Sequence, residues 1–241
     1  MKLSNRLEMV VSFVKPGESA ADVGTDHGHV PVELVRRGIV KRAYAMDVRK
    51  GPLSKAEENI AAAGMKEKIE TRLSDGVQKL SAGEAESVII AGMGGELVIH
   101  IMENGRHVWD TVEQWVLSPH SELQKVRYWL EQNGFSIRKE DMVYEDGKYY
   151  TILDVRKAGV TELLCQEGKE DLSLEKDYRY GTYLRNMKNP IFFDYLKDEE
   201  TKLLTLKANL EKQAVQSERA KESLREVEEK LSLNREVQNE M

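Results

Sequence analysis

The strongest structural signal in the chain lies at residues 19–28, which spell Ser19-Ala20-Ala21-Asp22-Val23-Gly24-Thr25-Asp26-His27-Gly28. A short apolar run that ends at a glycine is typical of a buried parallel strand. The segment from Pro31 to Arg37 then has the apolar spacing of a helix, and Gly38 terminates it. A strand followed at once by a helix indicates the first unit of an α/β fold. Because ligands of such sheets bind outside the carboxyl ends of the strands, the loop after Val23 is the first candidate binding loop.

The alternation of strand and helix continues along the chain. The patterns predict further strands at 43–46, 69–73, 87–91 and 115–117, and helices at 53–63 and 121–133. The helix at 121–133 is expected to have Ser121 as its N-cap. Two extended segments, 135–144 and 148–157, then flank Glu145-Asp146-Gly147, which is typical of a hairpin. The sequence therefore predicts an α/β fold with a mostly parallel sheet and an antiparallel edge strand.

The end of the chain follows a period of seven residues. Leucines at 196, 203, 210, 224 and 231 mark the period, with Ser217 as a polar gap, and Leu206, Ala220 and Val227 follow three positions later. This pattern indicates a coiled coil, and the alternative is a solvated amphipathic helix folded onto the main domain. The polar stretch around 213–217 favours a turn, so we expect an antiparallel helical hairpin in preference to a single rod.

Length, composition and charge limit the class of protein. The 241 residues allow a first domain at 1–160 and a helical domain at 161–241. The single cysteine, Cys165, cannot form an internal disulfide, which predicts a reducing, cytoplasmic location. The longest purely apolar run, 88–91, is far too short to cross a membrane. The formal net charge of −6 argues against a general nucleic-acid coat but leaves a local basic face open.

Acidic residues follow the first three predicted strands, at the sheet edge where a ligand would lie. Asp22 and Asp26 stand in the first loop, Asp47 follows the second strand, and Asp75 follows the third. Carboxylates in the first loop would repel a phosphate and favour a cationic ligand. Asp47 stands where an acid can accept hydrogen bonds from both ribose hydroxyls, and Asp75 where one can accept from an adenine amine. Glycines at 92, 94 and 95 follow the fourth strand and let a ligand touch the backbone.

Together these features indicate a binding site for S-adenosylmethionine, which carries an ammonium and a sulfonium. The predicted cofactor-binding residues are Asp22, Gly24, Thr25, Asp26, His27, Asp47, Val48, Asp75, Gly76, Ala91, Gly92 and Met93. Each feature alone has a structural alternative, because an aspartate at a strand end can cap a helix or form a turn. No metal site is predicted, because the five histidines have no cysteine partners.

Several motifs resemble those of the bacterial TrmK family, which methylates N1 of adenine 22 in tRNA. They are Leu3-Ser4-Asn5-Arg6-Leu7, residues 22–27, Ile90-Ala91-Gly92-Met93-Gly94-Gly95, Glu145-Asp146-Gly147-Lys148-Tyr149-Tyr150 and the heptad tail. The resemblance covers the whole chain. It implies a Rossmann-like class I methyltransferase domain, S-adenosyl-L-methionine as cofactor, tRNA as substrate and a C-terminal helical coiled coil.

The chain departs from the family pattern at two places. Gly28-His29-Val30 stands where a sequence like Ala-Tyr-Leu is expected, and His120 follows Ser118-Pro119 where an asparagine is expected. The second departure predicts that the loop after the fifth strand contacts its target differently in this chain.

Two other functions remain open. An exocyclic-amine methyltransferase acting on N6 of adenine often carries Asn/Asp-Pro-Pro-Tyr after the fourth strand, where this chain has Ala91-Gly92-Met93-Gly94. A non-catalytic tRNA-binding protein with a degenerate methyltransferase fold would have no use for the acids at the strand ends. Binding of S-adenosylmethionine to the pure protein separates the last possibility from the others.

Asp26 and Met93 are the predicted catalytic residues. N1 of an unpaired adenine already has a lone pair, so catalysis can rest on positioning and electrostatics without a general base. Asp26 is expected to stabilise the charge that develops on the base or to accept from its N6 amine, and its alternative role is a helix cap or turn. Met93 is expected to line the pocket for a base that has left its stack.

Two sets of basic residues are candidates for RNA binding. The first lies around the cofactor half of the chain and consists of Arg36, Arg37, Lys41, Arg42 and Arg49. The second precedes the heptads, interleaves with Tyr180 and Tyr183, and consists of Lys176, Tyr178, Arg179, Arg185 and Lys188. The alternative for the second set is an amphipathic linker whose tyrosines pack on the main domain. A monomer is expected in preference to a coiled-coil dimer.

Overall fold

The computed structural model describes residues 3–159, 171–214 and 217–241. The chain divides into two compact units, Met1–Lys169 and Glu170–Met241. The domain boundary predicted after residue 160 falls within residues 160–170, outside the described residues, and stays a prediction.

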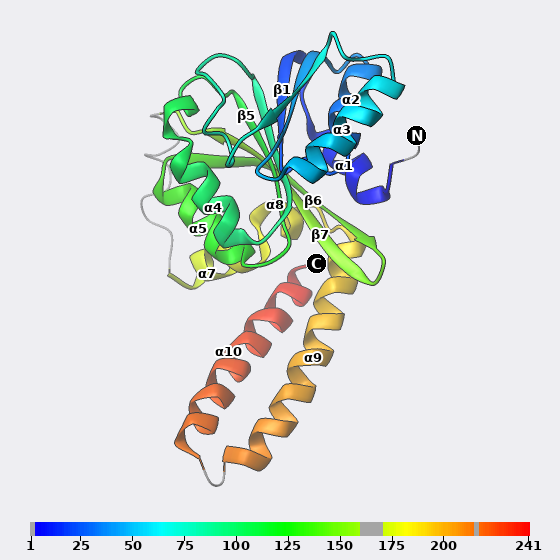
Figure 1. Ribbon diagram of the computed structural model, residues 1–241. Helices are drawn as coiled ribbons and strands as arrows, with labels where there is room; N and C mark the ends of the chain where they lie inside the picture. The colour runs from blue at the N-terminus through cyan, green and yellow to red at the C-terminus, as the bar shows by residue number, and fades with distance from the viewer. Residues whose placement is uncertain (1–2, 160–170, 215–216) are drawn as a thin grey trace. The chain divides into compact units, whose positions relative to one another are not determined.

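The first unit is a seven-stranded sheet with helices on both faces (Figure 1). Its elements are α1 (Asn5–Phe13), β1 (Gly17–Val23), α2 (His29–Arg36), β2 (Val40–Asp47), α3 (Lys50–Ala62), β3 (Ile69–Leu73), β4 (Ser87–Met93), α4 (Gly95–Asn104), η1 (Arg106–Val108), β5 (Gln114–Pro119), α5 (Leu123–Gln132), β6 (Phe135–Glu145) and β7 (Lys148–Lys157).

The strand order is β3-β2-β1-β4-β5-β7-β6. Strands β1 to β5 pair in parallel, whereas β7 runs antiparallel to both β5 and β6. The predicted fold class, a mostly parallel Rossmann-like sheet with an antiparallel edge strand, is confirmed. The turn between β6 and β7 is formed by Asp146 and Gly147, whose φ angles are 48° and 76°. Two positive φ angles suit the tight turns that follow the natural twist of a hairpin.

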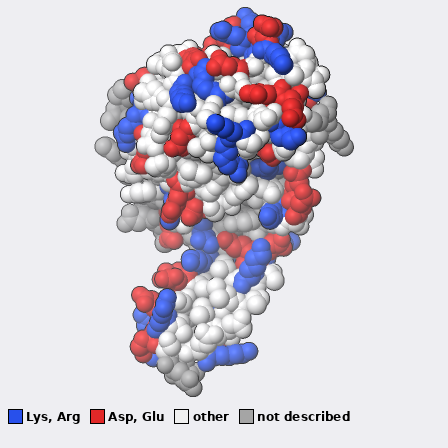
Figure 2. All heavy atoms as spheres, viewed as in Figure 1, with Lys and Arg blue, Asp and Glu red and all other residues white. Residues whose placement is uncertain are grey.

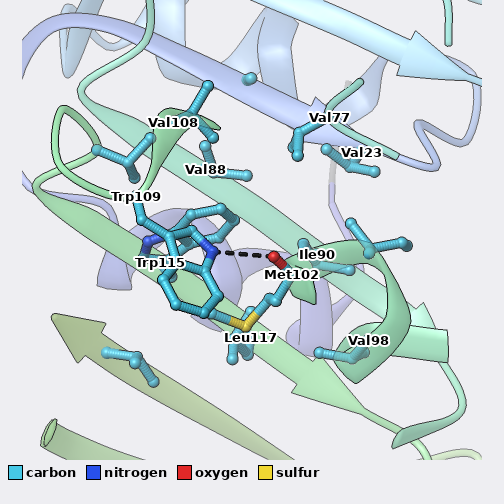
Figure 3. Close-up of a cluster of buried hydrophobic side chains, with 14 of the residues drawn as sticks. Val23, Val77, Val88, Ile90, Val98, Met102, Val108, Trp109, Trp115 and Leu117 are labelled. Carbon is cyan, nitrogen blue, oxygen red and sulfur yellow. Dashed lines mark hydrogen bonds between the residues drawn. The ribbon is translucent and has the colours of Figure 1, made fainter. Parts of the chain in front are cut away.

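Two hydrophobic cores hold the helices to the sheet. On one face, α4 and α5 pack on β4 and β5 through Val98, Met102 and Leu130. Figure 3 shows this core around Trp109 and Trp115, where the indole nitrogen of Trp109 donates to the carbonyl oxygen of Met102 at 2.9 Å. On the other face, α1, α2 and α3 cover the sheet with mainly aliphatic side chains. Burial on both faces explains why the central strands are continuous apolar runs.

Two local features differ from the sequence predictions. The expected N-cap of α5 at Ser121 is wrong, because Glu122 occupies that position with φ 55° and without a side-chain cap. The hydroxyl of Ser121 instead donates to Glu122 Oε2 at 2.9 Å, and the same oxygen accepts from the amide of Glu96 in α4. The patterns also missed α1. Its signal was a serine N-cap, since the Ser4 hydroxyl accepts from the amide of Leu7.

The second unit contains α7 (Asp171–Tyr180), α8 (Thr182–Asn186), α9 (Pro190–Ala214) and α10 (Glu218–Glu240). Helices α9 and α10 form the predicted antiparallel hairpin (Figure 1). Leu203 packs against Val227 and Leu231, and the hydroxyl of Ser217 caps α10 by accepting from the amide of Ala220. Leu206 is 46% exposed, so its predicted place in the seam is wrong. A single partner helix covers only one narrow stripe of α9, and Leu206 lies outside that stripe.

Candidate functional site

A pocket of about 290 Å³ opens at the carboxyl ends of β1, β2, β3 and β4. It lies where the strand order reverses, because β2 and β3 extend the sheet on one side of β1 while β4 and β5 extend it on the other. This crevice is the usual ligand site of open α/β sheets. The predicted cofactor-binding residues that line it are Gly24, Asp47, Val48, Asp75, Gly76, Ala91, Gly92 and Met93.

The pocket also has a lining that the sequence patterns did not assign to it. Leu97 and Ile101 of α4 lie one helical turn apart and so share a face. Leu97 is 47% exposed and Val48 is 61% exposed. Two exposed aliphatic side chains at the rim give a planar ring a surface on which to pack. The available signal was the four-residue spacing of these two apolar residues just after the Gly-rich loop. The remaining lining residues are Val23, Arg49 and Ser74.

Asp47 occupies the end of β2 and is 5% exposed. Its Oδ1 accepts from the amide of Arg49 at 2.7 Å, and the Arg49 Nε lies 3.6 Å from the same oxygen. The second carboxylate oxygen has no hydrogen-bond partner among the described residues. The Asp47 side chain therefore keeps an acceptor at the pocket for a ligand hydroxyl.

Gly76 at the end of β3 keeps the pocket narrow. Its φ is +54°, and a β-carbon added there would lie 2.9 Å from Cγ2 of Ile101 in α4. A side chain at this position would have to push α4 away from the strand ends. Glycine at 76 thus permits the close approach of backbone and helix that forms this wall.

Asp22 and Thr25 are buried and do not belong to the lining of the pocket. Their exposed fractions are 7% and 1%. Burial raises the pKa of Asp22 to about 6, and the negative charges of Asp26 and Asp47 act in the same direction. A buried, poorly solvated carboxylate favours a cation nearby, because the cation restores the stabilisation that water would give.

Asp26 and His27 also lie outside the pocket lining. The Asp26 side chain is 84% exposed, with one carboxylate oxygen 3.2 Å from His27 Nε2. His27 has φ 58°, and its carbonyl oxygen accepts from Nδ2 of Asn59 in α3 at 2.8 Å. The rings of His27 and His29 stack with their centroids 5.5 Å apart. The loop is therefore fixed to α3, and Asp26 stands at the surface two residues beyond Gly24, which lines the pocket.

Comparisons with known proteins identify the family. Residues 3–153 match a family model described as a methyltransferase domain. Over 237 residues, 98% of this chain and 97% of the relative, the sequence is 30% identical to the tRNA (adenine(22)-N(1))-methyltransferase of Bacillus subtilis. The chain belongs to the TrmK family. The crystal structure of B. subtilis TrmK, an m1A22 tRNA methyltransferase, has a TM-score of 0.85 at 30% identity and covers 98% of this chain and 99% of that one.

A second solved structure shares the TrmK fold and was determined with a ligand. Sp1610 of Streptococcus pneumoniae, in complex with S-adenosyl-L-methionine, has a TM-score of 0.83 at 34% identity. The similarity covers 98% of this chain and 100% of that one. Similarity over essentially the whole length of each chain includes both the sheet and the C-terminal helices.

The first predicted RNA-binding set of this TrmK-family chain does not surround the pocket. Arg36 and Arg37 lie at the end of α2, and Lys41 and Arg42 lie at the start of β2. Helix α2 leaves the carboxyl edge of the sheet and returns to the opposite edge, so these residues lie far from the pocket. Of this set only Arg49 lines the pocket, and RNA binding by the other four stays a prediction.

Three of the four cations that lie away from the pocket have carboxylate partners. The buried Glu33 accepts from Arg36 at 2.6 Å and from Arg37 at 3.1 Å. Arg37 reaches Glu8 of α1 as well, at 2.5 Å. Lys41 pairs with an exposed carboxylate, Glu18, at 2.6 Å. Arg36 and Arg37 therefore help to fix α2 in the fold.

The second predicted RNA-binding set lies in the second unit, and three of its cations form internal ion pairs. Lys176 lies 2.9 Å from Glu236. Arg179 lies 2.8 Å from Glu199, and Arg185 lies 2.7 Å from Glu240. The side chains of these cations are 11%, 19% and 17% exposed. Helices α7 and α8 use these ion pairs to attach to α9 and α10, and RNA binding by the three cations stays a prediction.

The aromatic residues in this part of the chain differ in how far they are exposed. Tyr180 is 1% exposed and packs with Phe192, with ring centroids 6.3 Å apart, so its predicted use as a stacking platform is wrong. Tyr183 is 37% exposed, and Tyr178 is half-buried. Lys188 is exposed, with φ 49°. RNA binding by Tyr178 and Lys188 remains a prediction.

Charges of both signs are mixed on the face of each unit seen in Figure 2, where Lys and Arg alternate with Asp and Glu. None of the described helices is both long and apolar enough to cross a membrane. Within residues 3–159, 171–214 and 217–241, no group of three or more His, Cys, Asp and Glu side chains is arranged to hold a metal ion.

Proposed function

We propose that the chain is an S-adenosyl-L-methionine-dependent methyltransferase that methylates N1 of adenine 22 in tRNA. The observation that carries the proposal is the combination of TrmK membership over the full length with the pocket at the strand ends. The name of the B. subtilis relative supplies the substrate and the modified atom, and the complex of the S. pneumoniae relative supplies the cofactor.

The residues of the pocket fit this cofactor group by group. The unpartnered oxygen of Asp47 suits a ribose hydroxyl, and Asp75 at the end of β3 suits the adenine amine. The exposed aliphatic side chains of Val48 and Leu97 suit the two faces of an adenine ring. The buried carboxylate of Asp22 favours positive charge, which the ammonium and sulfonium of the cofactor carry. Thr25 and His27 support the same loop and are proposed as indirect contributors.

The chemistry asks the protein to position the reactants. When bound, the cofactor supplies an electrophilic methyl group. The N1 lone pair of adenine forms a new bond to the methyl carbon as the carbon–sulfur bond breaks, and the positive charge passes from sulfur to the base. No proton has to be removed, so no general base is required. Asp26 is proposed to stabilise the cationic product base, and Met93 to contact that base from the end of β4.

The adenine must leave any base pair before it can react, because N1 lies within the Watson–Crick edge. The proposal therefore includes an unpaired or flipped-out adenine. An enzyme with this substrate works where tRNA is found, and we place it in the cytoplasm. As in the sequence analysis, a monomer is proposed, and light scattering at micromolar concentration would reveal a dimer if one forms.

The decisive experiment is methylation of an unmodified tRNA transcript with methyl-labelled cofactor, followed by nucleoside analysis. We expect 1-methyladenosine, and its loss when adenine 22 is replaced by guanine. Label in N6-methyladenosine would favour the exocyclic-amine activity, against which the Ala91-Gly92-Met93-Gly94 sequence argues. Cofactor binding without any labelled nucleoside would favour a non-catalytic tRNA-binding protein.

The roles of the two proposed domains can be tested by removing the second unit. A chain that ends at residue 169 keeps the sheet and both of its cores. We expect it to bind the cofactor with the affinity of the full chain and to lose tRNA methylation, because a small methyltransferase unit offers few phosphate contacts. Full tRNA activity of the shortened chain would show that the helical unit is not needed for RNA docking.

A further inference from the structure

Three segments that the cofactor pocket does not explain meet in one cluster. They are the N-terminal segment with Arg6, the loop after β5 with His120, and strand β7 with Tyr150. The Arg6 Nη1 lies 3.2 Å from His120 Nε2. The Arg6 guanidinium carbon lies 5.2 Å from the centroid of the Tyr150 ring, and the His120 and Tyr150 ring centroids are 5.3 Å apart. Each of the three side chains thus contacts the other two.

The cluster borders the cofactor pocket through Gly92 and Met93. A β-carbon added to Gly92 would lie 3.2 Å from Arg6 Nη1 and 3.8 Å from His120 Nε2. The amide of His120 donates to the carbonyl oxygen of Met93 at 2.8 Å. Gly92 and Met93 also belong to the pocket lining, so the end of β4 lies between the cluster and the pocket.

The cluster is held by the fold on two of its sides. The amide of Asn5 donates to Glu145 Oε1 at 2.6 Å, which ties the start of α1 to the β6–β7 hairpin. Leu7 and Tyr150 both pack against the core on the α1 face of the sheet. His120 itself is exposed, and Arg6 and Tyr150 are half-buried. The cluster is therefore preformed and still open to solvent.

The hydrogen-bond chemistry fixes the state of His120. An arginine guanidinium donates only, so Nε2 of His120 must be the acceptor and the imidazole must be neutral, with its proton on Nδ1. The pKa of His120 is below its usual value, because its ring is partly desolvated and because Arg6 and Lys148 are cationic neighbours. A neutral imidazole offers a flat ring face without adding positive charge beside a base that becomes cationic.

We propose that Arg6, His120 and Tyr150 form the binding site for the nucleotide that is methylated. The proposal rests on the proposed function and adds to it the residues that hold the substrate. The rings of His120 and Tyr150 offer aromatic surface for the flipped-out adenine, and Arg6 offers a charged donor for the phosphate of the same nucleotide. Stacking on aromatic side chains together with an arginine is the usual way in which proteins hold an unpaired RNA base.

The test compares four variants in steady-state methylation of tRNA. Tyr150→Leu removes the ring, Tyr150→Phe keeps it, and Arg6→Met removes the charge but keeps much of the stem. Tyr144→Leu is the matched control, because Tyr144 belongs to the same hairpin and is 50% exposed. Val143 pairs with Tyr150, so the next residue, Tyr144, lies on the opposite face of the hairpin from Tyr150. Cofactor affinity by calorimetry and thermal unfolding are measured for every variant.

We expect Tyr150→Leu and Arg6→Met each to lower kcat/KM for tRNA by about 10-fold or more, the range expected when one base–aromatic or charged contact is lost. Tyr150→Phe and Tyr144→Leu should stay within about 3-fold of the unchanged protein, and all four should keep its cofactor affinity. If Tyr150→Leu fails to fold, Arg6→Met decides the question, because Arg6 is only half-buried and methionine keeps much of its stem.

Two results would overturn the inference while leaving the proposed function intact. One is normal methylation of tRNA by both Tyr150→Leu and Arg6→Met. The other is a loss of cofactor affinity in these variants as large as their loss of methylation, which would mean that the cluster only supports the pocket. If the unchanged protein makes no 1-methyladenosine, the proposed function itself fails, and the inference fails with it.

Discussion

Gly24 and Met93, at the ends of β1 and β4, lie against each other in the lining of the proposed cofactor pocket. A β-carbon on Gly24 would lie only 2.0 Å from Cε of Met93, and Gly24 has φ +73°. The amide of Gly24 donates to the carbonyl oxygen of Met46 at 2.8 Å, which fixes the turn to β2. The Met93 side chain can occupy this place only because residue 24 has no side chain.

Gly24→Ala should therefore weaken cofactor binding by about 10-fold or more, since the displaced Met93 methyl group must move within the pocket. Because alanine is strained in the left-handed conformation of residue 24, Gly24→Ala should also lower the free energy of unfolding by about 1–2 kcal/mol. Gly38→Ala is the matched control, because Gly38 has φ +67° and open space where its β-carbon would lie. It should show the loss of stability and keep the cofactor affinity. If the two variants bind the cofactor with equal affinity, Met93 does not contribute to the cofactor site.

Asp47→Ala should weaken binding of S-adenosyl-L-methionine by about 1–3 kcal/mol, because ligand hydroxyls would lose a buried acceptor. Calorimetry measures this directly. Asp110→Ala is a suitable control, because Asp110 is an exposed surface aspartate that pairs with Lys157. If Asp47→Ala binds the cofactor as tightly as Asp110→Ala does, Asp47 has no part in the site.

Asp22 should make both stability and cofactor binding depend on pH. Its pKa is raised by burial from an ordinary value of 3.8 to about 6 in the folded protein. The folded state then holds this proton more tightly than the unfolded state, so the stabilisation is present at low pH and is lost as the pH rises from about 4 to about 6. A shift of about two units corresponds to an upper limit of about 3 kcal/mol.

Asp22→Asn should consequently unfold at a higher temperature than the unchanged ligand-free protein above pH 6. It should bind the cofactor more weakly there, because the carboxylate that attracts the cation is gone. In the unchanged protein the affinity should fall as the pH drops below about 6, and in Asp22→Asn it should vary less. Thermal unfolding and calorimetry between pH 5 and 8 test both trends, and parallel pH profiles for the two proteins would contradict them.

Asp26→Asn should keep the fold and most of the cofactor affinity and should lower the single-turnover rate of tRNA methylation. The motivation is the position of Asp26, whose carboxylate is 84% exposed and only two residues from the pocket lining. A carboxylate there can stabilise the positive charge that the base acquires. An unchanged rate at saturating cofactor and tRNA would mean that Asp26 has only a structural role, through its contact with His27.

Much of the fold was predictable because it is encoded in residues close together in the chain. The apolar run that ends at Gly24 predicted β1, and Asp146-Gly147 predicted the hairpin turn. The heptad leucines predicted the antiparallel pair α9 and α10, although the exposed Leu206 shows that the repeat alone does not say which stripe a partner covers. Strand ends of a parallel sheet meet at one edge, so Asp47, Gly76 and Met93 could be assigned to one pocket before their contacts were known.

What sequence could not supply were the pairings between distant segments and the burial that results from them. Arg6 and His120 are 114 positions apart, and no local period relates them. The carboxyl groups of Asp22 and Asp26 look equivalent in one loop, yet packing buries the first and leaves the second at the surface. Arg179 looked like an RNA contact until Glu199 of another helix proved to be its partner. Local patterns depend on neighbours two to seven residues away, whereas solvation and charge pairing depend on which elements the tertiary structure brings together.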